Sequence, residues 1–269
     1  MFYTGKIVQT HRVIQMKSLY SFLFVFTFSL MALSYPAMAA YEEFEYSEAE
    51  KAGLAFYHFA GQEPDFRKWI QEYEYYLTAK PSKKNEILYE DQIRLEQGYR
   101  QFNPETDYIT FKTSVLVHVP KFEKRMDFLN EYQKIPVKIQ LPRMLEIPGS
   151  QETYFPYYVG GMWFAIIPEN FQDLYIIYLD EAEFYEFEQE LDIGRSTTVK
   201  KVRAEFVMRV KGADTQAPFP IGETESWLVM GEIGNMQLRH KDRNFTLWEY
   251  EAPWYIPKSR QDLMNLFKQ

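Results

Sequence analysis

The sequence has no cysteine among its 269 residues. This absence excludes a disulfide framework, and it also excludes acylation of a cysteine as a lipid anchor. A cysteine-free protein that works outside the cytoplasm must be stabilised by burial of apolar surface alone, which is compatible with a bacterial periplasm.

Histidine is scarce as well, with four residues, and none has a second histidine three to five positions away. That spacing is typical of zinc sites, so no zinc site is expected. Gly160-Gly161 and the pair Gly231 and Gly234 lack the residues of a phosphate loop, and no Gly-x-Ser-x-Gly motif occurs. The sequence therefore predicts no metal and no cofactor, and it favours a non-enzymatic protein.

Basic residues are fewer than acidic ones, 30 against 38, which gives a net charge of −8. An acidic surface repels phosphate groups, so we expect neither a nucleic-acid partner nor binding to anionic membranes. The acids are dense from Asp180 to Asp192, but no glycine provides the turn of a calcium loop there. Phe184, Phe187 and Leu191 share one helical face, which predicts a solvated acidic helix packed on a sheet.

An uncharged apolar run extends from Leu19 to Leu33. It is shorter than the roughly 20 residues of a membrane span and matches a signal peptide. Lys17 precedes the run, and Ala37-Met38-Ala39 suits a signal peptidase. We therefore predict a signal peptide over residues 1–39, cleaved between Ala39 and Ala40, in preference to an uncleaved membrane anchor.

Met16-Lys17-Ser18 makes a compact basic start, so Met16 rather than Met1 is the expected first residue of the precursor. Removal of residues 1–39 takes away three bases and no acid, and changes the net charge from −8 to −11. The mature form is expected to be exported, periplasmic or secreted, soluble and not membrane-spanning.

Residues 40–105 are predicted to form a helical N-terminal region. Ser47 and Glu50 match a capping box at the start of a first helix. A second helix is expected after Pro64 and a third from Lys83 to Phe102. The second helix carries an apolar stripe that we expect to be buried, formed by Phe66, Trp69, Ile70, Tyr73 and Leu77.

Residues 106–269 are predicted to be a β-rich domain. Strands are expected over residues 108–119, 137–141, 162–167, 174–179, 198–211, 226–239 and 245–250. Residues 121–134 fit a helix or a strand, and residues 259–267 fit a short final helix. The predicted fold class is α+β, with a helical N-terminal part followed by a mainly antiparallel β-rich part with a packed helix.

The segment from Leu174 to Leu179, the acidic helix after it and the strand from Val199 to Val210 resemble uncharacterised bacterial exported proteins. The resemblance covers roughly the C-terminal half of the chain. It implies export, but it implies no activity and no site residue.

Aromatic residues are abundant, and five of them fall between Tyr154 and Trp163 beside Gly160-Gly161. Glycines allow a ligand to approach the backbone, and aromatic rings can stack on a sugar or a peptide. Alternatively, the rings form the loop's own apolar cluster. The candidate ligand-binding residues are Tyr154, Tyr157, Tyr158 and Trp163.

Glu223 and Glu225 are the candidates for an alternative, catalytic site. In a strand they would lie on one face with Trp227, about 7 Å apart, and glycosidases use two carboxyl groups at a comparable separation. The alternative interpretation is that Glu223 and Glu225 are charged residues of an edge strand, which discourage aggregation.

The expected function is therefore that of an exported, non-enzymatic binding or accessory module of the cell envelope. Its partner would be a glycan, a peptide or an envelope protein, and the sequence assigns no oligomeric state. The rival hypothesis is an exported hydrolase that acts on glycans through Glu223 and Glu225. A third is a structural partner in an envelope assembly.

Overall fold

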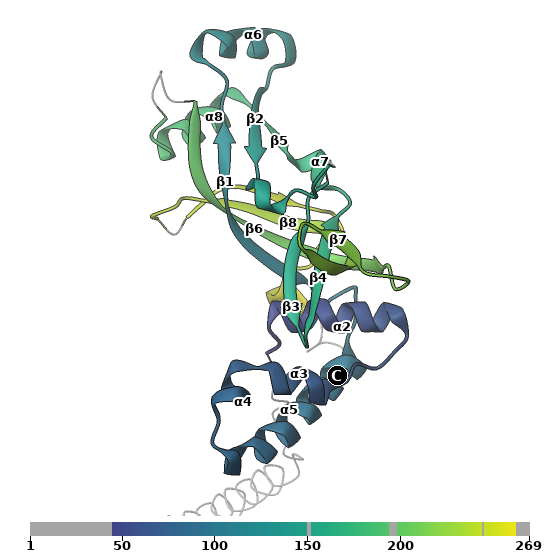
Figure 1. Cartoon of the computed structure of the whole chain (residues 1–269). Coiled ribbons are helices and arrows are strands. Elements are labelled where there is room, and N and C mark those ends of the chain that lie inside the picture. The colour runs from purple at the N-terminus through teal and green to yellow at the C-terminus, as the bar shows by residue number, and fades with distance from the viewer. Residues whose placement is uncertain (1–44, 150–151, 194–197, 244, 262–269) are drawn as a thin grey trace, which may run out of the picture. The chain divides into compact units, whose positions relative to one another are not determined.

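The structure is a computed structural model that describes residues 45–149, 152–193, 198–243 and 245–261. The predicted signal peptide and its cleavage site after Ala39 lie outside the described residues. All but the first described residue belong to one unit, Tyr46–Gln269, which contains the elements labelled in Figure 1.

The helices of this unit are, in chain order, α2 (Glu48–Ala60), α3 (Phe66–Glu72), α4 (Glu74–Thr78), α5 (Pro81–Gln101), α6 (Phe122–Tyr132), the 3-10 turn η1 (Arg143–Leu145), α7 (Phe171–Leu174) and α8 (Glu181–Glu190). The strands are β1 (Ile109–His118), β2 (Ile135–Gln140), β3 (Phe155–Val159), β4 (Met162–Pro168), β5 (Ile176–Leu179), β6 (Val199–Ala213), β7 (Phe219–Ile221), β8 (Thr224–Arg239) and β9 (Thr246–Glu251). Helices together with one mixed, strongly curled sheet make an α+β fold, as predicted.

Two helices begin with the capping that their sequences favour. At α2, the Ser47 hydroxyl accepts from the Glu50 amide at 3.2 Å, and the Glu50 carboxylate accepts from the Ser47 amide at 2.8 Å. Asp180 and Glu183 make the same reciprocal pair at α8. Each pair satisfies two amides that have no partner within the helix, which fixes where the helix starts.

The apolar stripe predicted for one helix is divided between two helices. Phe66, Trp69 and Ile70 on α3 are buried as predicted. Tyr73 leaves the helical conformation with ψ 136°, and the chain restarts as α4, which turns Leu77 outward to 60% exposure. The expectation of a buried Leu77 was therefore wrong.

Other boundaries also differ from the sequence prediction. Pro81 occupies the first position of α5, where its missing amide costs nothing, so that helix starts before Lys83. The strand expected from Leu174 begins only at Ile176, because Leu174 ends α7. Residues 258–261 are helical, and the rest of the predicted final helix lies outside the described residues.

The sheet has the strand order β3-β4-β8-β6-β1-β2-β5, with β7 and β9 also paired to β8. Among the described strands, β4 and β8 pair in parallel and the other neighbours are antiparallel. A register shift between β6 and β8 leaves Gly234 without a partner residue on β6, so β8 has a bulge there.

The sheet curls so far that distant strands meet across its inner face. The Phe155 ring on β3 lies 4.3 Å from Phe111 on β1 and 5.2 Å from Phe206 on β6, centroid to centroid. Helix α2 packs on this face through Phe56, whose ring contacts Phe164 and Trp227. The core therefore lies inside the curl, and we call the opposite side of these strands the outer face.

Helices lie toward both ends of the sheet in Figure 1. α3, α4 and α5 gather at the end where the β3–β4 hairpin lies, and α6 stands at the other end between β1 and β2. The acidic segment forms α8 with Phe184, Phe187 and Leu191 buried, which confirms that prediction. Within the described part of the chain, no helix is both long and apolar enough to cross a membrane.

Candidate functional site

The segment from Tyr154 to Trp163 is mostly a β-hairpin rather than the predicted loop. Gly160 and Gly161 form its turn with φ angles of 61° and 78°, which glycine adopts at little cost. A Cβ atom on Gly160 would overlap the Trp69 ring, and one on Gly161 would lie 2.7 Å from a carboxylate oxygen of Glu72. The glycines thus let the hairpin tip pack directly on α3.

Strand alternation separates the candidate tyrosines. Tyr157 faces the core, where its hydroxyl donates to the backbone oxygen of Thr110 at 3.1 Å. Burial, with a smaller contribution from Glu48, raises the pKa of Tyr157 well above its usual range. Tyr158 points to the outer face and is 48% exposed, so these two neighbours cannot contact one ligand together.

Tyr158 stands beside Trp163, its partner across the hairpin, with ring centroids 5.1 Å apart. Trp163 is 39% exposed. The Tyr158 hydroxyl donates to Glu72 on α3 at 3.0 Å, and this hydrogen bond raises the pKa of Tyr158. The bond fixes the position of the tyrosine ring at the edge of the sheet.

The strand register extends this pair into a row. Trp163 on β4 is aligned with Ser226 on β8, and Phe219 on β7 is aligned with the same serine from the other side. Aligned residues of neighbouring strands lie on the same face, so Phe219, 43% exposed, joins Trp163 and Tyr158 on the outer face. We call Tyr158, Trp163 and Phe219 the aromatic row.

The row has a regular spacing because the strands impose it. Neighbouring strands lie about 4.8 Å apart, so Trp163 and Phe219, two strands apart, are separated by about 10 Å at the backbone. Ser226 between them is small and buried, and adds no bulk above the sheet. Half-buried Leu228 and Met230 continue the apolar surface along β8.

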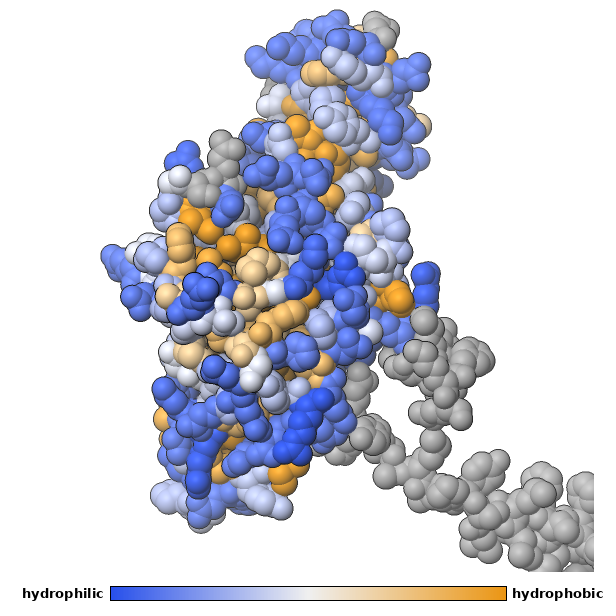
Figure 2. Space-filling model, turned by 90° about the vertical axis from the view of Figure 1, so that its right-hand side faces the viewer, coloured by the Kyte–Doolittle hydropathy of each residue, from blue (hydrophilic) through white to orange (hydrophobic). Residues whose placement is uncertain are grey.

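Figure 2 shows hydrophobic residues gathered in the middle of one face of the molecule, the face on the right-hand side of Figure 1. Exposed apolar groups that are contiguous, unlike scattered ones, are characteristic of interaction sites. The aromatic row therefore combines exposed rings with a rigid support of paired strands.

The remaining candidate residues lie elsewhere. Tyr154 precedes β3, is half-buried and bonds through its amide to the backbone oxygen of Leu145. Glu223 lies in the turn between β7 and β8, whereas Glu225 is the second residue of β8 and is exposed. Trp227, two residues after Glu225 on β8, shares its face as predicted, and packs on the core side against Phe56.

The described histidines have local structural contacts. His118 bonds to Gln140 on the adjacent strand β2 at 2.8 Å. His240 accepts hydrogen bonds from the backbone amides of Asp242 and Arg243 in the turn between β8 and β9. His58 is exposed near the end of α2, with its ring against Phe102. Among the residues that the structure describes, no group of three or more histidine or acidic side chains is arranged to hold a metal ion.

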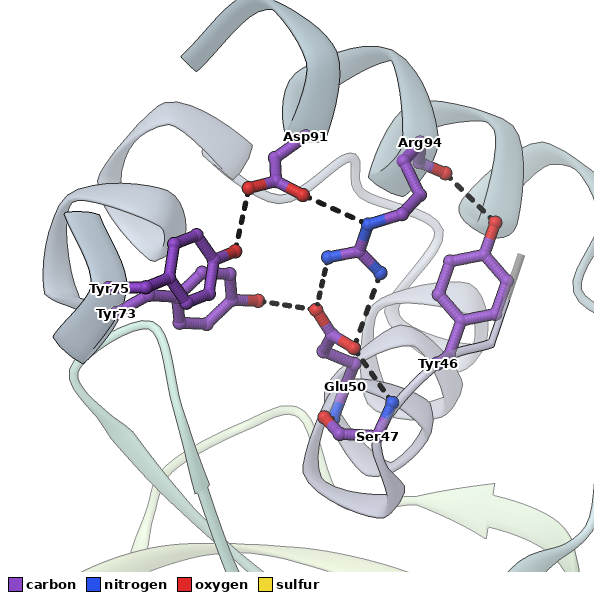
Figure 3. A network of polar contacts seen from close by, with 7 residues as sticks. All are labelled: Tyr46, Ser47, Glu50, Tyr73, Tyr75, Asp91 and Arg94. Atoms are coloured by element: carbon purple, nitrogen blue, oxygen red, sulfur yellow. Dashed lines mark hydrogen bonds and ion pairs between the residues drawn. The ribbon is translucent and has the colours of Figure 1, made fainter. Parts of the chain in front are cut away.

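A polar network joins α2 and α5 to the residues around the break between α3 and α4 (Figure 3). Arg94 donates to both oxygens of Glu50, at 2.7 and 3.4 Å. Tyr73 donates to Glu50 at 2.7 Å. Asp91 accepts from Arg94 at 3.0 Å and from Tyr75 at 2.6 Å. Every charge in the network therefore faces a partner.

The electrostatics of this network indicate a structural role. Burial acts to raise the pKa of Glu50. The hydrogen bonds and the charge of Arg94, together with the hydrogen bonds from Tyr73 and from the Ser47 amide, outweigh burial and hold the pKa of Glu50 below its usual value. Burial and Glu50 raise the pKa of Tyr73 above its usual range. Glu50 is held as a carboxylate and Tyr73 as a phenol, so neither is poised to exchange a proton near neutral pH.

Sequence reasoning found Tyr158 and Trp163 but missed Phe219 and Glu72. Phe219 lies among prolines in a segment expected to be a loop, and its place in the row depends on pairing with β8. Glu72 meets Tyr158 across 86 positions of sequence. Helix docking has no local signal, and the prolines on either side of Phe219 weigh against the short strand that pairs with β8.

No family model matches the chain, and neither the curated proteins nor the solved structures compared with it include a match.

Proposed function

We propose that the mature chain is an exported, non-enzymatic binding protein that holds a neutral glycan against the aromatic row. The observation that carries the proposal is the alignment of Tyr158, Trp163 and Phe219 on one face, each 39–48% exposed. In this proposal the helical region, residues 40–105, supports the hairpin, and the β-rich domain, residues 106–269, carries the row and the packed helix α8.

Ring chemistry favours a sugar as the ligand. The face of an aromatic ring is electron-rich and attracts the C–H groups on the face of a sugar ring, without any need for opposite charges. Rings on adjacent and next-adjacent strands offer several stacking positions in a line, which suits a chain of sugars. The edges of Tyr158 and Trp163 add a hydroxyl and an indole N–H for polar contacts.

Charge favours a neutral ligand over an acidic one. Glu72 bonds to Tyr158, and Glu223 is exposed in the turn between β7 and β8. Glu225 is next to Ser226 on β8 and therefore points to the face opposite the row. The carboxylates of Glu72 and Glu223 can accept hydrogen bonds from sugar hydroxyls, whereas they repel carboxylated or sulfated glycans.

The first experiment is a titration of the protein's tryptophan fluorescence with soluble neutral oligosaccharides: cello-, chito- and malto-hexaose. Binding of at least one is expected, with weaker binding of a sulfated counterpart. Tyr158→Ala and Phe219→Ala should each weaken binding about tenfold, since stacking on one aromatic ring contributes on the order of 1 kcal/mol or more.

Tyr89→Ala provides the matched control, because Tyr89 is 70% exposed on α5 and lies outside the row. It should leave affinity unchanged. An oligosaccharide whose affinity survives both row substitutions would show that the row is not the site.

A further inference from the structure

A groove separates α6 from α8 at the end of the sheet away from the hairpin. It is open to solvent, and its volume of about 930 Å³ is within the range of ligand sites. Met126 and Leu129 of α6 form one wall, Ala182 and Tyr185 of α8 form the other, and Ile135 lies at the start of β2. None of these residues belongs to the aromatic row.

Each of the two helices contributes an exposed apolar side chain to the groove. Met126 is 57% exposed and Tyr185 61% exposed. Leu129 is only partly buried, although it lies on the inner side of α6. The two helices therefore present an unfilled apolar trough.

The base of the groove is held by an ion pair. Arg125 of α6, 7% exposed, donates to Glu188 of α8 at 2.6 Å, and its guanidinium lies 5.0 Å from the centre of the Phe184 ring. This contact joins the two helices at a fixed separation, so the trough is preformed.

The α8 wall is strongly negative. From Asp180 to Glu190 it carries six acids and no base. Arg125 balances Glu188, and Arg243 lies 3.4 Å from Glu190 at an exposed position. Glu181, at the mouth of the groove, is exposed and has no ion-pair partner among the described residues within 4 Å. The wall thus attracts cations.

We propose that this groove binds a basic amphipathic helix of a partner protein. Apolar side chains of that helix would lie between Met126 and Tyr185, completing a three-helix packing, and its lysine or arginine side chains would face Glu181 and the rest of α8. A helix in a preformed apolar groove is an established mode of recognition, and charge complementarity selects the sign of the partner. The inference is independent of the glycan proposal.

The test uses a fluorescein-labelled peptide with leucines at helical spacing and lysines on the remaining face, and a twin in which every lysine is glutamate. Anisotropy titrations with the exported protein should show binding of the lysine peptide and at least tenfold weaker binding of the twin. Met126→Ala and Tyr185→Ala, both at exposed positions, should each weaken binding about tenfold.

Matched controls separate the groove from general attraction to an acidic protein. Met144→Ala and Tyr89→Ala alter residues outside the groove that are more exposed, 77% and 70%, and should have no effect. Glu181→Lys should weaken binding more than Glu90→Lys, the same charge change at an exposed position on α5.

Three results would overturn the inference. The first is the absence of binding by the lysine peptide, and the second is equal loss of affinity in groove and control variants. The third is a dimer of the protein that Met126→Ala dissociates, because the occupant would then be a second copy of this chain.

Discussion

Trp69 is the residue on which the hairpin and the helices converge. Its ring is 1% exposed, contacts Tyr57 and Phe66, and lies against Gly160. Trp69→Ala should lower the free energy of unfolding by about 3–5 kcal/mol, as removal of a large buried ring leaves a cavity. Denaturant melts of the purified protein measure this.

Leu77 serves as the control from the same predicted stripe. It is 60% exposed, so Leu77→Ala should change the free energy of unfolding by less than about 0.5 kcal/mol. Similar effects at Trp69 and Leu77 would contradict the observed break between α3 and α4.

Glu50 gives a second prediction, for the ion pair at the centre of the polar network. Its side chain is 7% exposed and that of Arg94 16%, so Glu50→Gln leaves a largely buried guanidinium without its main counter-charge. We expect a loss of about 3 kcal/mol at neutral pH, measured by urea denaturation. Glu86→Gln, which breaks an exposed pair with Lys83, should cost no more than about 1 kcal/mol.

The same residue predicts a direction for the pH dependence. The pKa of Glu50 is lower in the folded protein than its ordinary value of 4.5. Its contribution is therefore fully present above that value and is lost as pH falls toward the folded-state pKa. The stability difference between wild type and Glu50→Gln should shrink between neutral pH and pH values below about 4; a constant difference would contradict this assignment.

Local sequence patterns predict some contacts of these residues and not others. The partnership of Ser47 with Glu50 has a local pattern and was predicted. The contacts of Glu50 with Arg94 and of Tyr73 with Glu50 span 44 and 23 positions, and no pattern marks them. Tyr73, which bonds to Glu50, leaves the helical conformation. The prediction failed at Leu77 because it assumed one continuous helix through Tyr73.

The β3–β4 hairpin gives a prediction about an element as a whole. Gly61 and Gly160 have nearly equal φ angles, 64° and 61°, but only Gly160 faces a neighbour that an added Cβ would strike. Gly61→Ala should cost about 1 kcal/mol through backbone strain. Gly160→Ala should cost at least about 1 kcal/mol more, since it also overpacks the contact with Trp69. Equal losses in thermal or urea melts would mean that the hairpin does not dock on α3.

Long elements with a clear period were predicted well, and relations between elements were not. The strands corresponding to β1, β6, β8 and β9 and the helix α8 match their predicted ranges closely, because alternation and capping are local signals. The parallel pairing of β4 with β8 brings together segments about 60 residues apart. The pairing of β7 with β8 joins segments only a few residues apart. Strand order depends on burial across the whole sheet, so the sequence predicted Tyr158 and Trp163 of the aromatic row but not Phe219.

For the molecule as a whole, export remains a prediction from the sequence. The apolar run from Leu19 to Leu33 and the small residues before Ala40 predict a mature product that begins at Ala40. N-terminal sequencing of the exported protein measures this directly. A secreted or periplasmic chain that still contains Leu19–Leu33 would contradict the prediction.

The proposed ligand-binding surface is the outer face of the sheet, through its aromatic row. The most direct test is the dissociation constant of the best neutral oligosaccharide, measured by isothermal titration for wild type, Trp163→Ala and the control Tyr89→Ala. Trp163 stands at the centre of the row, so its loss should raise the dissociation constant by about tenfold or more, while the control matches wild type. Equal dissociation constants for all three proteins, with Trp163→Ala folded by circular dichroism, would contradict the account.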